Sequence, residues 1–279
     1  MNVISEKLTN DILPIIVIYK LSIRDSLAWQ SLNTDYSYFS SVLIYDNSPV
    51  SQPIPDTRFK VYYLHDHHNS GVSKAYNEGL KMADSLGKKW LLLLDQDTQL
   101  PNDIIASYAQ SIYQYPEENF FAPILNDKIG IVSPFSYSYG ITHRLNAVKK
   151  GVLSLSKYRA VNSCSLIRTQ AMKLAGGFDE RLPLDHSDIY FQEKLALNRS
   201  SFVVVNACIK HRFSGTEVSN KNDTLIRFEI FCKSCITMSM LTQFESNFRK
   251  VSLKRALNLS LRFFTIRFIV LHLQLWNKR

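Results

Sequence analysis

Short hydrophobic runs alternate with segments of helical periodicity from the N-terminus to about residue 115. The runs have the length of buried strands and lead into polar or turn-forming residues, which predicts strands at Ile12–Tyr19, Ser41–Tyr45, Phe59–Leu64 and Leu91–Leu94. The segments between them carry apolar residues every three or four positions, which predicts helices at Ile23–Leu32, Gly71–Leu86 and Asn102–Tyr113. Strands that alternate with helices in this way predict an α/β fold, with a parallel sheet covered by helices on both faces.

The pattern changes in the second half of the chain. From residue 119 to about 165, short apolar runs separated by turn residues predict added strands or hairpins, at Ile129–Ser133, Gly140–Leu145, Gly151–Leu155 and Ala160–Ile167. A short helix, a second helix and a strand are predicted next, at Thr169–Ala175, Ile189–Leu197 and Phe202–Val205. Helical spacing then continues from Asp223 to the end. We therefore expect one α/β domain over residues 1–222 and a helical region over residues 223–279.

Polar residues follow the predicted strands at the ends where a parallel sheet binds its ligands. In open α/β sheets, that site lies outside the carboxyl ends of the strands. The polar residues at these ends are Tyr19, Asp46-Asn47, Asp66 and Asp95-Gln96-Asp97. Because these ends meet at one edge of the sheet, we expect the side chains to converge there.

Asp95 and Asp97 directly follow the most hydrophobic strand, and three interpretations of the pair compete. In the first, Asp97 or Thr98 caps the helix after Pro101, and Asp95 only ends a strand. In the second, the pair is similar to the first motif of the haloacid-dehalogenase phosphatases, in which Asp95 would become an aspartyl-phosphate. In the third, the two carboxylates serve a nucleotide-sugar site, one toward a divalent cation on the diphosphate and one toward the ribose.

Composition and charge narrow the choice of partners. The hydrophobic content of 46% and the charged content of 20% are ordinary for a globular protein. The net charge of +9 is concentrated after Glu245, where no acidic residue occurs and eight cations do: Arg249, Lys250, Lys254, Arg255, Arg262, Arg267, Lys278 and Arg279. The rest of the chain is close to neutral, which argues against a broad nucleic-acid-binding face.

Three familiar sequence signals are missing. The first residues lack the basic and apolar regions of a signal peptide, and no stretch of 18 residues is uniformly apolar. Cys232 and Cys235 have a C-x-x-C spacing, but they fall inside a helical run and no second pair completes a zinc site. We interpret these cysteines as structural, in a protein of a reducing compartment.

Five phrases occur in order along the chain: "IYDNSP", "NSGVSKAYNEGL", "LLLLDQDT" shortly before a proline, "AGGFDERLPLDHSDIYFQEKL" and "IKHRFSG". As an ordered set, they resemble the inverting GT-A glycosyltransferases of the family-two class, and most closely the bacterial rhamnosyltransferase-like members. The similarity covers roughly residues 12 to 215. It implies a GT-A fold, in which a Rossmann-like nucleotide-binding mixed sheet is flanked by helices, here with a C-terminal helical extension.

The resemblance also assigns roles to individual residues. By this match, Asp188 takes the place of the catalytic base, and Asp97 holds the metal with His211 as a further metal or phosphate ligand. The acceptor side would be formed by Asp185, His186 and Tyr190. The expected donor-nucleotide contacts, which include four from the polar strand ends, are Tyr19, Asp46, Asp66, Asn69, Gly71, Asn77 and Asp95.

Together these roles imply transfer of a sugar, rhamnose by the resemblance, from a dTDP- or UDP-sugar to a hydroxyl of a surface glycan such as O-antigen or capsule. Transfer would proceed with inversion and with Mg²⁺ or Mn²⁺. Tyr190 stands where relatives often have a second acidic residue, and Leu182-Pro183 where paired aromatics are common, so the acceptor is the open point. The alternatives are an inactive nucleotide- or glycan-binding relative and the phosphatase, whose motif normally ends the first strand of its domain.

The basic and apolar segment 249–279 has more than one interpretation. Its pattern fits a helix packed on the domain. It also fits an interfacial helix on an anionic inner leaflet, with Trp276 at the boundary. A partner-binding helix or a homodimer interface is a further alternative. We expect a cytoplasmic enzyme, peripheral on the inner face of the cytoplasmic membrane, that acts on a glycan or lipid-linked glycan and binds no nucleic acid.

Overall fold

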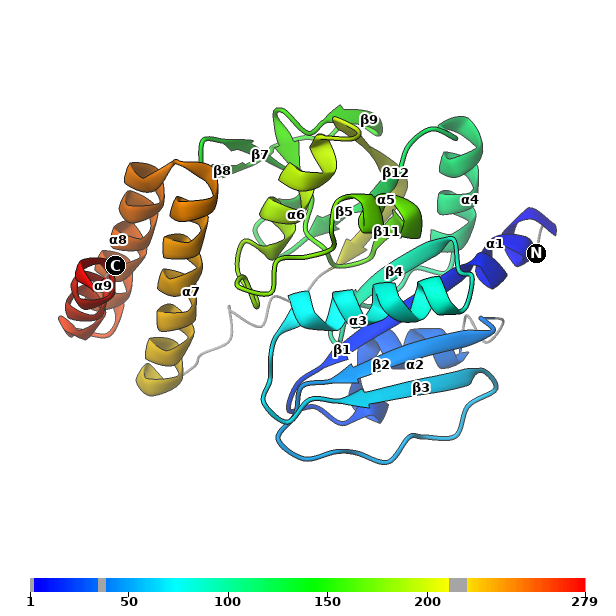
Figure 1. The fold of residues 1–279 in the computed structure, drawn as a ribbon, viewed down its shortest axis with the longest axis horizontal. Coiled ribbons are helices and arrows are strands. Elements are labelled where there is room, and N and C mark those ends of the chain that lie inside the picture. The colour runs from blue at the N-terminus through cyan, green and yellow to red at the C-terminus, as the bar shows by residue number, and fades with distance from the viewer. Residues whose placement is uncertain (1–2, 35–38, 211–219, 279) are drawn as a thin grey trace.

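The computed structural model describes residues 3–34, 39–210 and 220–278. Its centre is a mixed sheet whose strand order is β3-β2-β1-β4-β11-β5-β12-β9, with β6 paired to β5 (Figure 1). Four strands on one side of this sheet run parallel to one another. They are β1 (Ile12–Ile18), β2 (Ser41–Asp46), β3 (Lys60–His65) and β4 (Trp90–Asp95).

The other half of the sheet mixes strand directions. Strand β11 (Ser165–Arg168) runs antiparallel to both β4 and β5 (Phe120–Asn126), while β12 (Ser201–Lys210) is parallel to β5. The edge strands β9 (Gly151–Ser154) and β6 (Ile131–Ser133) are antiparallel to their neighbours. A small antiparallel sheet joins β10 (Tyr158–Arg159), β7 (Phe135–Ser138) and β8 (Ile141–Arg144).

Helices cover both faces of the main sheet, which explains the run of leucines in β4. Leu92 and Leu94 face a core shared with α1, α2 and α4, whereas Leu91 and Leu93 face a core shared with α3, α5 and α6. All four leucines are fully buried, and each such burial stabilises the fold by about 1.5–3 kcal/mol. The helices are α1 (Val3–Asp11), α2 (Leu27–Thr34), α3 (Val72–Ser85), α4 (Ile104–Gln114), α5 (Thr169–Leu174) and α6 (Ser187–Ala196).

The predicted α/β fold with a mixed sheet and a C-terminal helical extension is confirmed, and several boundaries differ. Helix α1 and strand β5 have no counterpart in the predicted elements. The predicted helix Ile23–Leu32 divides into a 3₁₀ turn, η1 (Ile23–Asp25), and α2, because the chain is extended at Ser26. Strand β12 continues to Lys210, well past the predicted end at Val205.

The C-terminal region forms three helices, α7 (Lys221–Thr242), α8 (Glu245–Arg262) and α9 (Arg267–Asn277), at one end of the molecule (Figure 1). Gln243 and Phe264, at the two breaks, adopt positive φ angles. The helices share a core with parts of the small sheet and of α6. Within the described ranges, no helix combines the length and apolar character needed to cross a bilayer.

Two sequence-based expectations about this region can be compared with its packing. Cys232 and Cys235 are free and buried in the shared core, in keeping with a structural role. Trp276, expected at a membrane boundary, is instead buried, and its indole Nε1 donates to Ser252 Oγ at 3.0 Å. Its place in the core follows from the pairing of α8 with α9, which turns this face of α9 inward.

Candidate functional site

The carboxyl ends of the parallel strands meet at one level of the sheet. Asp95, the last residue of β4, lies opposite Val17 of β1, and Asp46 lies opposite Ile18 and His65 on its two neighbours. The partly buried side chain of Asp95 accepts a hydrogen bond from the hydroxyl of Tyr76 at 3.3 Å. Since Tyr76 belongs to α3, this bond joins the helix above the sheet to the end of its central strand.

A third carboxylate, that of Asp188 in α6, is near enough for its charge to act on the same hydroxyl. Asp95, Asp188 and Asp97 all act on Tyr76, and burial together with these negative charges raises the pKa of its hydroxyl well above 10.0. Asp188 lies in the first turn of α6, where the helix dipole favours a carboxylate. The structure therefore brings together the three aspartates that the resemblance assigned to donor, metal and base.

The environment of Asp188 is that of a base that is active near neutral pH. Burial raises its pKa from 3.8 to about 6, with further increases from the charges of Asp185 and Asp95. The backbone amide of Ile189 donates to Asp188 Oδ1 at 2.8 Å and opposes part of that increase. Asp188 is thus ionised at pH 7, yet more basic than an exposed aspartate.

The same cluster supplies the type of donor atom that a hard divalent cation prefers, but it supplies too few ligand side chains. Asp95 and Asp97 supply carboxylate oxygens, which Mg²⁺ and Mn²⁺ prefer. Within the described part of the chain, no group of three or more His, Cys, Asp or Glu side chains could hold a metal ion. His211, the second expected ligand, lies outside the described residues. An ion at this edge would therefore need oxygen ligands from a bound diphosphate.

The residues that flank Asp97 position the loop that follows β4. Gln96 Oε1 accepts the backbone N–H of Tyr19 at 2.8 Å, and its carbonyl accepts from Ser26 Oγ at 2.9 Å. Thr98 Oγ1 lies 2.7 Å from the hydroxyl of Ser163, so this side chain does not cap α4, whose N-cap position is Asp103. The ring of Tyr19 is 41% exposed at this edge, where a flat base or sugar has access to it.

Asp46, expected to contact the nucleotide, is turned inward. It is fully buried, and its Oδ1 accepts the backbone N–H of Ser48 at 2.9 Å. Its Oδ2 accepts from Tyr63 at 2.8 Å and from Gln52 at 3.1 Å. In this structure Asp46 holds the loop after β2, because the neighbouring strand and loop supply donors to both carboxylate oxygens.

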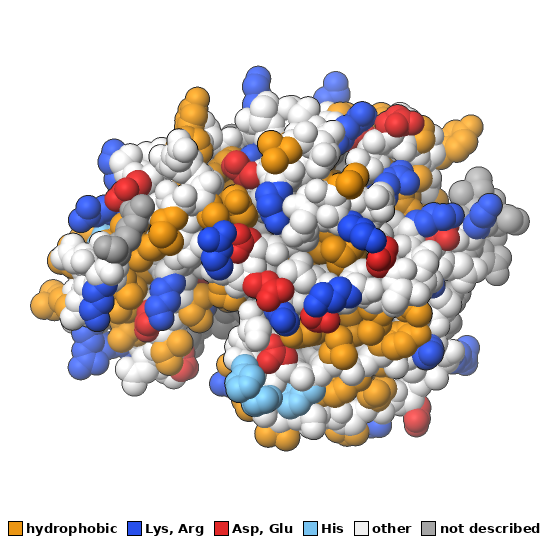
Figure 2. All heavy atoms as spheres, viewed as in Figure 1, with side chains coloured by type: hydrophobic (Ala, Val, Ile, Leu, Met, Phe, Trp, Pro, Cys, Tyr) orange, Lys and Arg blue, Asp and Glu red, His pale blue; other side chains and the backbone are white. Residues whose placement is uncertain are grey.

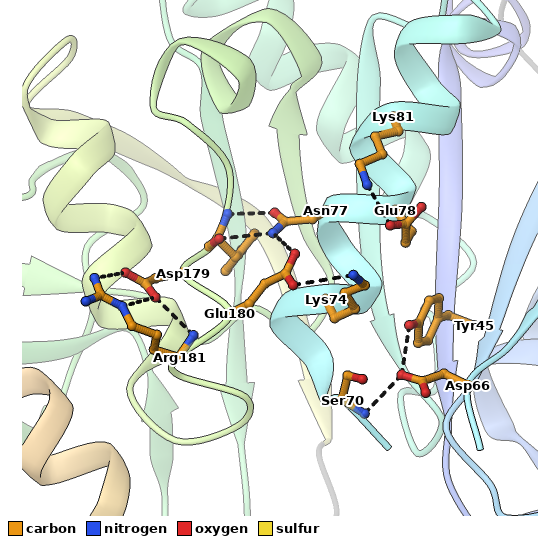
Figure 3. Close-up of polar contacts among 11 residues, drawn as sticks. Tyr45, Asp66, Ser70, Lys74, Asn77, Glu78, Lys81, Asp179, Glu180 and Arg181 are labelled. Carbon is orange, nitrogen blue, oxygen red and sulfur yellow. Dashed lines mark hydrogen bonds and ion pairs between the residues drawn. The ribbon is translucent and has the colours of Figure 1, made fainter. Parts of the chain in front are cut away.

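Asp66 organises the turn that leads into α3. Its Oδ2 accepts the backbone N–H of Ser70 at 3.0 Å and the hydroxyl of Tyr45 at 3.0 Å (Figure 3). Burial alone would raise the pKa of Asp66, but hydrogen bonds from Ser70, Tyr45 and His68 outweigh it and lower that pKa. Asn69 is exposed in the same turn, with a φ of 52°.

The first residues of α3 contact the segment that precedes Asp188. The N–H of Val72 donates to the carbonyl of Pro183 at 2.7 Å, and Ser73 Oγ donates to the carbonyl of Leu182 at 2.5 Å. Gly71 has a φ of 93°, and a Cβ atom there would lie 2.2 Å from the carbonyl oxygen of Pro183. Only glycine fits this contact, so Gly71 allows α3 and the 182–183 segment to approach closely.

Asn77, expected to line the nucleotide pocket, instead connects α3 to residues 178–180 (Figure 3). Its Nδ2 donates to the Phe178 carbonyl at 3.0 Å and to Glu180 Oε1 at 2.9 Å, while its Oδ1 accepts the N–H of Phe178 at 2.8 Å. Lys74 lies 3.5 Å from Glu180 on the same side of the helix. One helix therefore holds both Asp95, through Tyr76, and the segment that leads to Asp188.

The three expected acceptor-side residues lie toward the C-terminal helices. Asp185 forms a two-bond ion pair with Arg227 of α7, with Nη2 2.8 Å from Oδ1. His186 lies against Phe231 and near Cys235, whose Sγ is 3.5 Å from its Nε2, and burial lowers the pKa of the imidazole to about 4. Tyr190 packs, partly buried, against the same core. Asp185 and His186 thus dock α6 on the helical extension.

Sequence patterns missed three residues that shape this site. Tyr76 was assigned only to the apolar face of a helix, because periodicity does not reveal a hydroxyl directed at a strand end. Arg227 pairs with a residue 42 positions away, and local patterns do not reveal such distances. Asn162 precedes β11 beside the end of β4, and its buried Oδ1 has no hydrogen-bond partner within the described chain.

Comparison with known proteins gives a family and a fold. A sequence family described as "Glycosyl transferase family 2" matches residues 25–173. No curated protein matches the chain. Among solved structures, S. aureus TarS 1–349 matches with a TM-score of 0.51 and 16% identity, over 90% of this chain and 72% of that chain. The same fragment in complex with UDP-GlcNAc has a TM-score of 0.50 at 16% identity, over 90% of this chain and 73% of that chain.

A second solved structure extends this fold likeness. GalNAc-T7 with UDP, GalNAc and Mn²⁺ has a TM-score of 0.55 and 13% identity. The match covers 86% of this chain but only 54% of GalNAc-T7, so this chain spans about half of that protein. At such identities the likeness establishes a shared fold, and the transferase family supersedes the phosphatase alternative.

Proposed function

We propose, from the premise that this chain belongs to glycosyl transferase family 2, that it moves a sugar from a nucleoside-diphosphate donor to an acceptor hydroxyl with inversion. The observation that carries the proposal is the hydrogen bond between the Tyr76 hydroxyl and Asp95, with the charges of Asp97 and Asp188 near enough to act on the same hydroxyl. Two carboxylates at a strand end suit the donor diphosphate, and a third with a raised pKa suits proton removal.

In the proposed reaction, Asp188 removes the proton of the acceptor hydroxyl as that oxygen attacks the anomeric carbon. The bond from this carbon to the diphosphate oxygen breaks on the opposite face, so the configuration inverts. Tyr76 orients Asp95 toward the donor, and the hydrogen bond from Asn77 to the Phe178 carbonyl keeps the segment before Asp188 in place.

Mg²⁺ or Mn²⁺ fits this arrangement as a cofactor. Asp97, with Asp95 beside it, would hold the ion together with the diphosphate oxygens, and His211 is the further ligand that we propose. A bound divalent cation neutralises the charge that develops on the departing diphosphate. The presence of Mn²⁺ in the GalNAc-T7 structure supports this choice of ion.

The donor that we propose is a dTDP- or UDP-sugar, with Tyr19, Asp66 and Asn69 at the nucleotide end of the site. UDP and UDP-GlcNAc in the TarS structures support a uridine donor, whereas the resemblance to rhamnosyltransferases favours dTDP-rhamnose. The acceptor would be a surface glycan, free or lipid-linked, such as O-antigen or capsule, and the enzyme would act at the inner face of the cytoplasmic membrane. Residues 1–222 would form the catalytic domain.

The test combines nucleotide binding with transfer. We expect UDP or dTDP to raise the thermal midpoint, and Mn²⁺ to enlarge that rise. The D188N variant should keep this shift and lose donor turnover by about 10²-fold or more, the usual contribution of a general base. D84N is the matched control, since the exposed Asp84 side chain forms an ion pair with Lys173 at 2.7 Å and has no other ion pair among the described residues. Turnover by D188N at the wild-type rate would exclude Asp188 as the base.

A further inference from the structure

Apolar side chains are exposed together at the end of the helical extension. Six residues of α8, α9 and their connection form what we call the α8–α9 face: Leu257, Leu261, Phe264, Ile266, Val270 and Leu273. Their exposed fractions range from 40% at Val270 to 97% at Phe264. Figure 2 shows hydrophobic and basic atoms interspersed over the end of the molecule that the helical extension occupies.

These exposed residues are separate from the core of the extension. In α8, Ala256 and Ser260 turn inward while Leu257 and Leu261 turn outward. In α9, Phe268, His272 and Trp276 are buried while Val270 and Leu273 are exposed. Both helices therefore already have an apolar face packed in the protein. A second apolar face contributes nothing to the folding of the chain that carries it, and it indicates contact with another body.

Phe264 provides an independent reason to expect such contact. It follows the last turn of α8 with a φ of 48°, a conformation that usually selects glycine or asparagine at a helix end. The N–H of Thr265 closes the turn on the carbonyl of Ser260 at 3.0 Å. A phenylalanine at this position has a strained backbone and a ring that is almost completely exposed. Neither feature stabilises the folded chain by itself.

The charges around the face select the kind of partner. Lys254, Arg262 and Arg267 are exposed on the same helices, Lys278 is exposed just after α9, and no acidic residue follows Glu245. A second copy of the chain docked through this face would set these cations against one another. A surface of anionic phosphates with an apolar layer beneath it is complementary to both the cations and the exposed side chains.

We propose that the α8–α9 face docks on the surface of a bilayer that contains anionic lipids. Phe264 and its apolar neighbours enter the boundary between headgroups and acyl chains, while the cations lie at the phosphates. The helices lie on the membrane, since no described helix is suited to span one. This proposal gives the protein a partner that its catalytic chemistry does not require, and it does not depend on which sugar is transferred.

Sedimentation of the full chain with vesicles tests the proposal. We expect binding to phosphatidylcholine vesicles that contain phosphatidylglycerol, weak binding to phosphatidylcholine alone, and loss of binding as salt rises. The double variant L261S/F264S should bind about tenfold more weakly or worse, and R262E/R267E should do the same, since each change removes at least one contact that favours the membrane. Thermal melting checks that both variants fold.

The control variant changes equally exposed apolar residues elsewhere. Leu197 is 86% exposed and Tyr113 is 84% exposed, both on the α/β part, so L197S/Y113S should bind vesicles like the wild type. Wild-type binding by both face variants would overturn the proposal, as would a wild type that ignores anionic vesicles. A dimer in sedimentation velocity that L261S/F264S dissolves would identify a second copy as the occupant instead. Because the readout is lipid binding, failure here leaves the proposed transfer reaction standing.

Discussion

Asp188 shows how the position of one carboxyl group fixes its chemistry. An aspartate in water has lost its proton long before neutral pH, and it is a weak base. Burial in the first turn of α6, near the charges of Asp185 and Asp95, brings the pKa of Asp188 to about 6. A base with that pKa is still ionised at pH 7, and it accepts a proton more readily than an exposed aspartate does.

The raised pKa of Asp188 predicts opposite effects of pH on activity and stability. Transfer, measured as kcat/KM, should fall about tenfold per pH unit below pH 6, because the base becomes protonated. The pKa of Asp188 in the folded protein lies above the ordinary value of 3.8. The stability that this carboxyl group contributes is therefore fully present below pH 3.8 and is lost as pH rises toward 6.

The D188N variant isolates that contribution to stability. Removal of the buried charge should raise the free energy of unfolding by ~1–3 kcal/mol at pH 8 and leave it nearly unchanged near pH 4. Denaturant titrations at the two pH values measure the difference. An equal effect of the variant at both values would show that Asp188 has an ordinary pKa in the folded protein.

At the scale of elements, α3 connects the two halves of the site. Its Tyr76 contacts the end of β4, its first turn contacts residues 182–183, and Asn77 contacts residues 178–180. The apolar face of the same helix is buried in the core below. A helix fixed in this way links the position of the strand end to that of the segment before Asp188, the base that we propose.

The N77A variant should therefore impair turnover more than donor binding. Loss of the three hydrogen bonds of this side chain should cost about 1–3 kcal/mol of stability and lower kcat by about tenfold, with the dissociation constant of UDP nearly unchanged. E78A, on the next residue of the helix, is the control, since Glu78 pairs with Lys81 at the surface and with no other cation among the described residues. Weakened UDP binding at normal kcat would place Asn77 in the nucleotide pocket, as the sequence motif suggested.

At the scale of the whole molecule, the sequence predicted those helices and strands that a local hydrophobic pattern encodes. The run Leu91–Leu94 indicated a buried strand, and the structure shows these leucines buried on both faces of the sheet. The parallel topology places Asp95 at the edge formed by the carboxyl ends of the strands, as expected. The inward turn of Asp46 depends on Tyr63 and Gln52, whose approach no local pattern shows. Strand β5 was missed in part because Pro123, which breaks most strand patterns, lies inside it.

An ion pair between Asp185 and Arg227 joins the helical extension to the segment that carries Asp188. Asp185 lies three residues before Asp188, and Arg227 belongs to α7. The variants D185R and R227D should each lower kcat by about tenfold and the free energy of unfolding by ~1–2 kcal/mol, a moderate value because the Arg227 side chain is 40% exposed.

The combined variant D185R/R227D decides whether the ion pair itself is responsible. A reversed pair restores the attraction, so we expect most of the lost kcat and thermal stability to return, as a double-mutant cycle measures. R181D is the matched control, because Arg181 pairs with Asp179 inside a single loop and contacts no residue of α7 among the contacts described. Single variants with normal kcat would mean that the extension is attached to the catalytic domain without influence on it. Restoration by the double variant would show instead that the ion pair between α7 and the segment before Asp188 supports turnover.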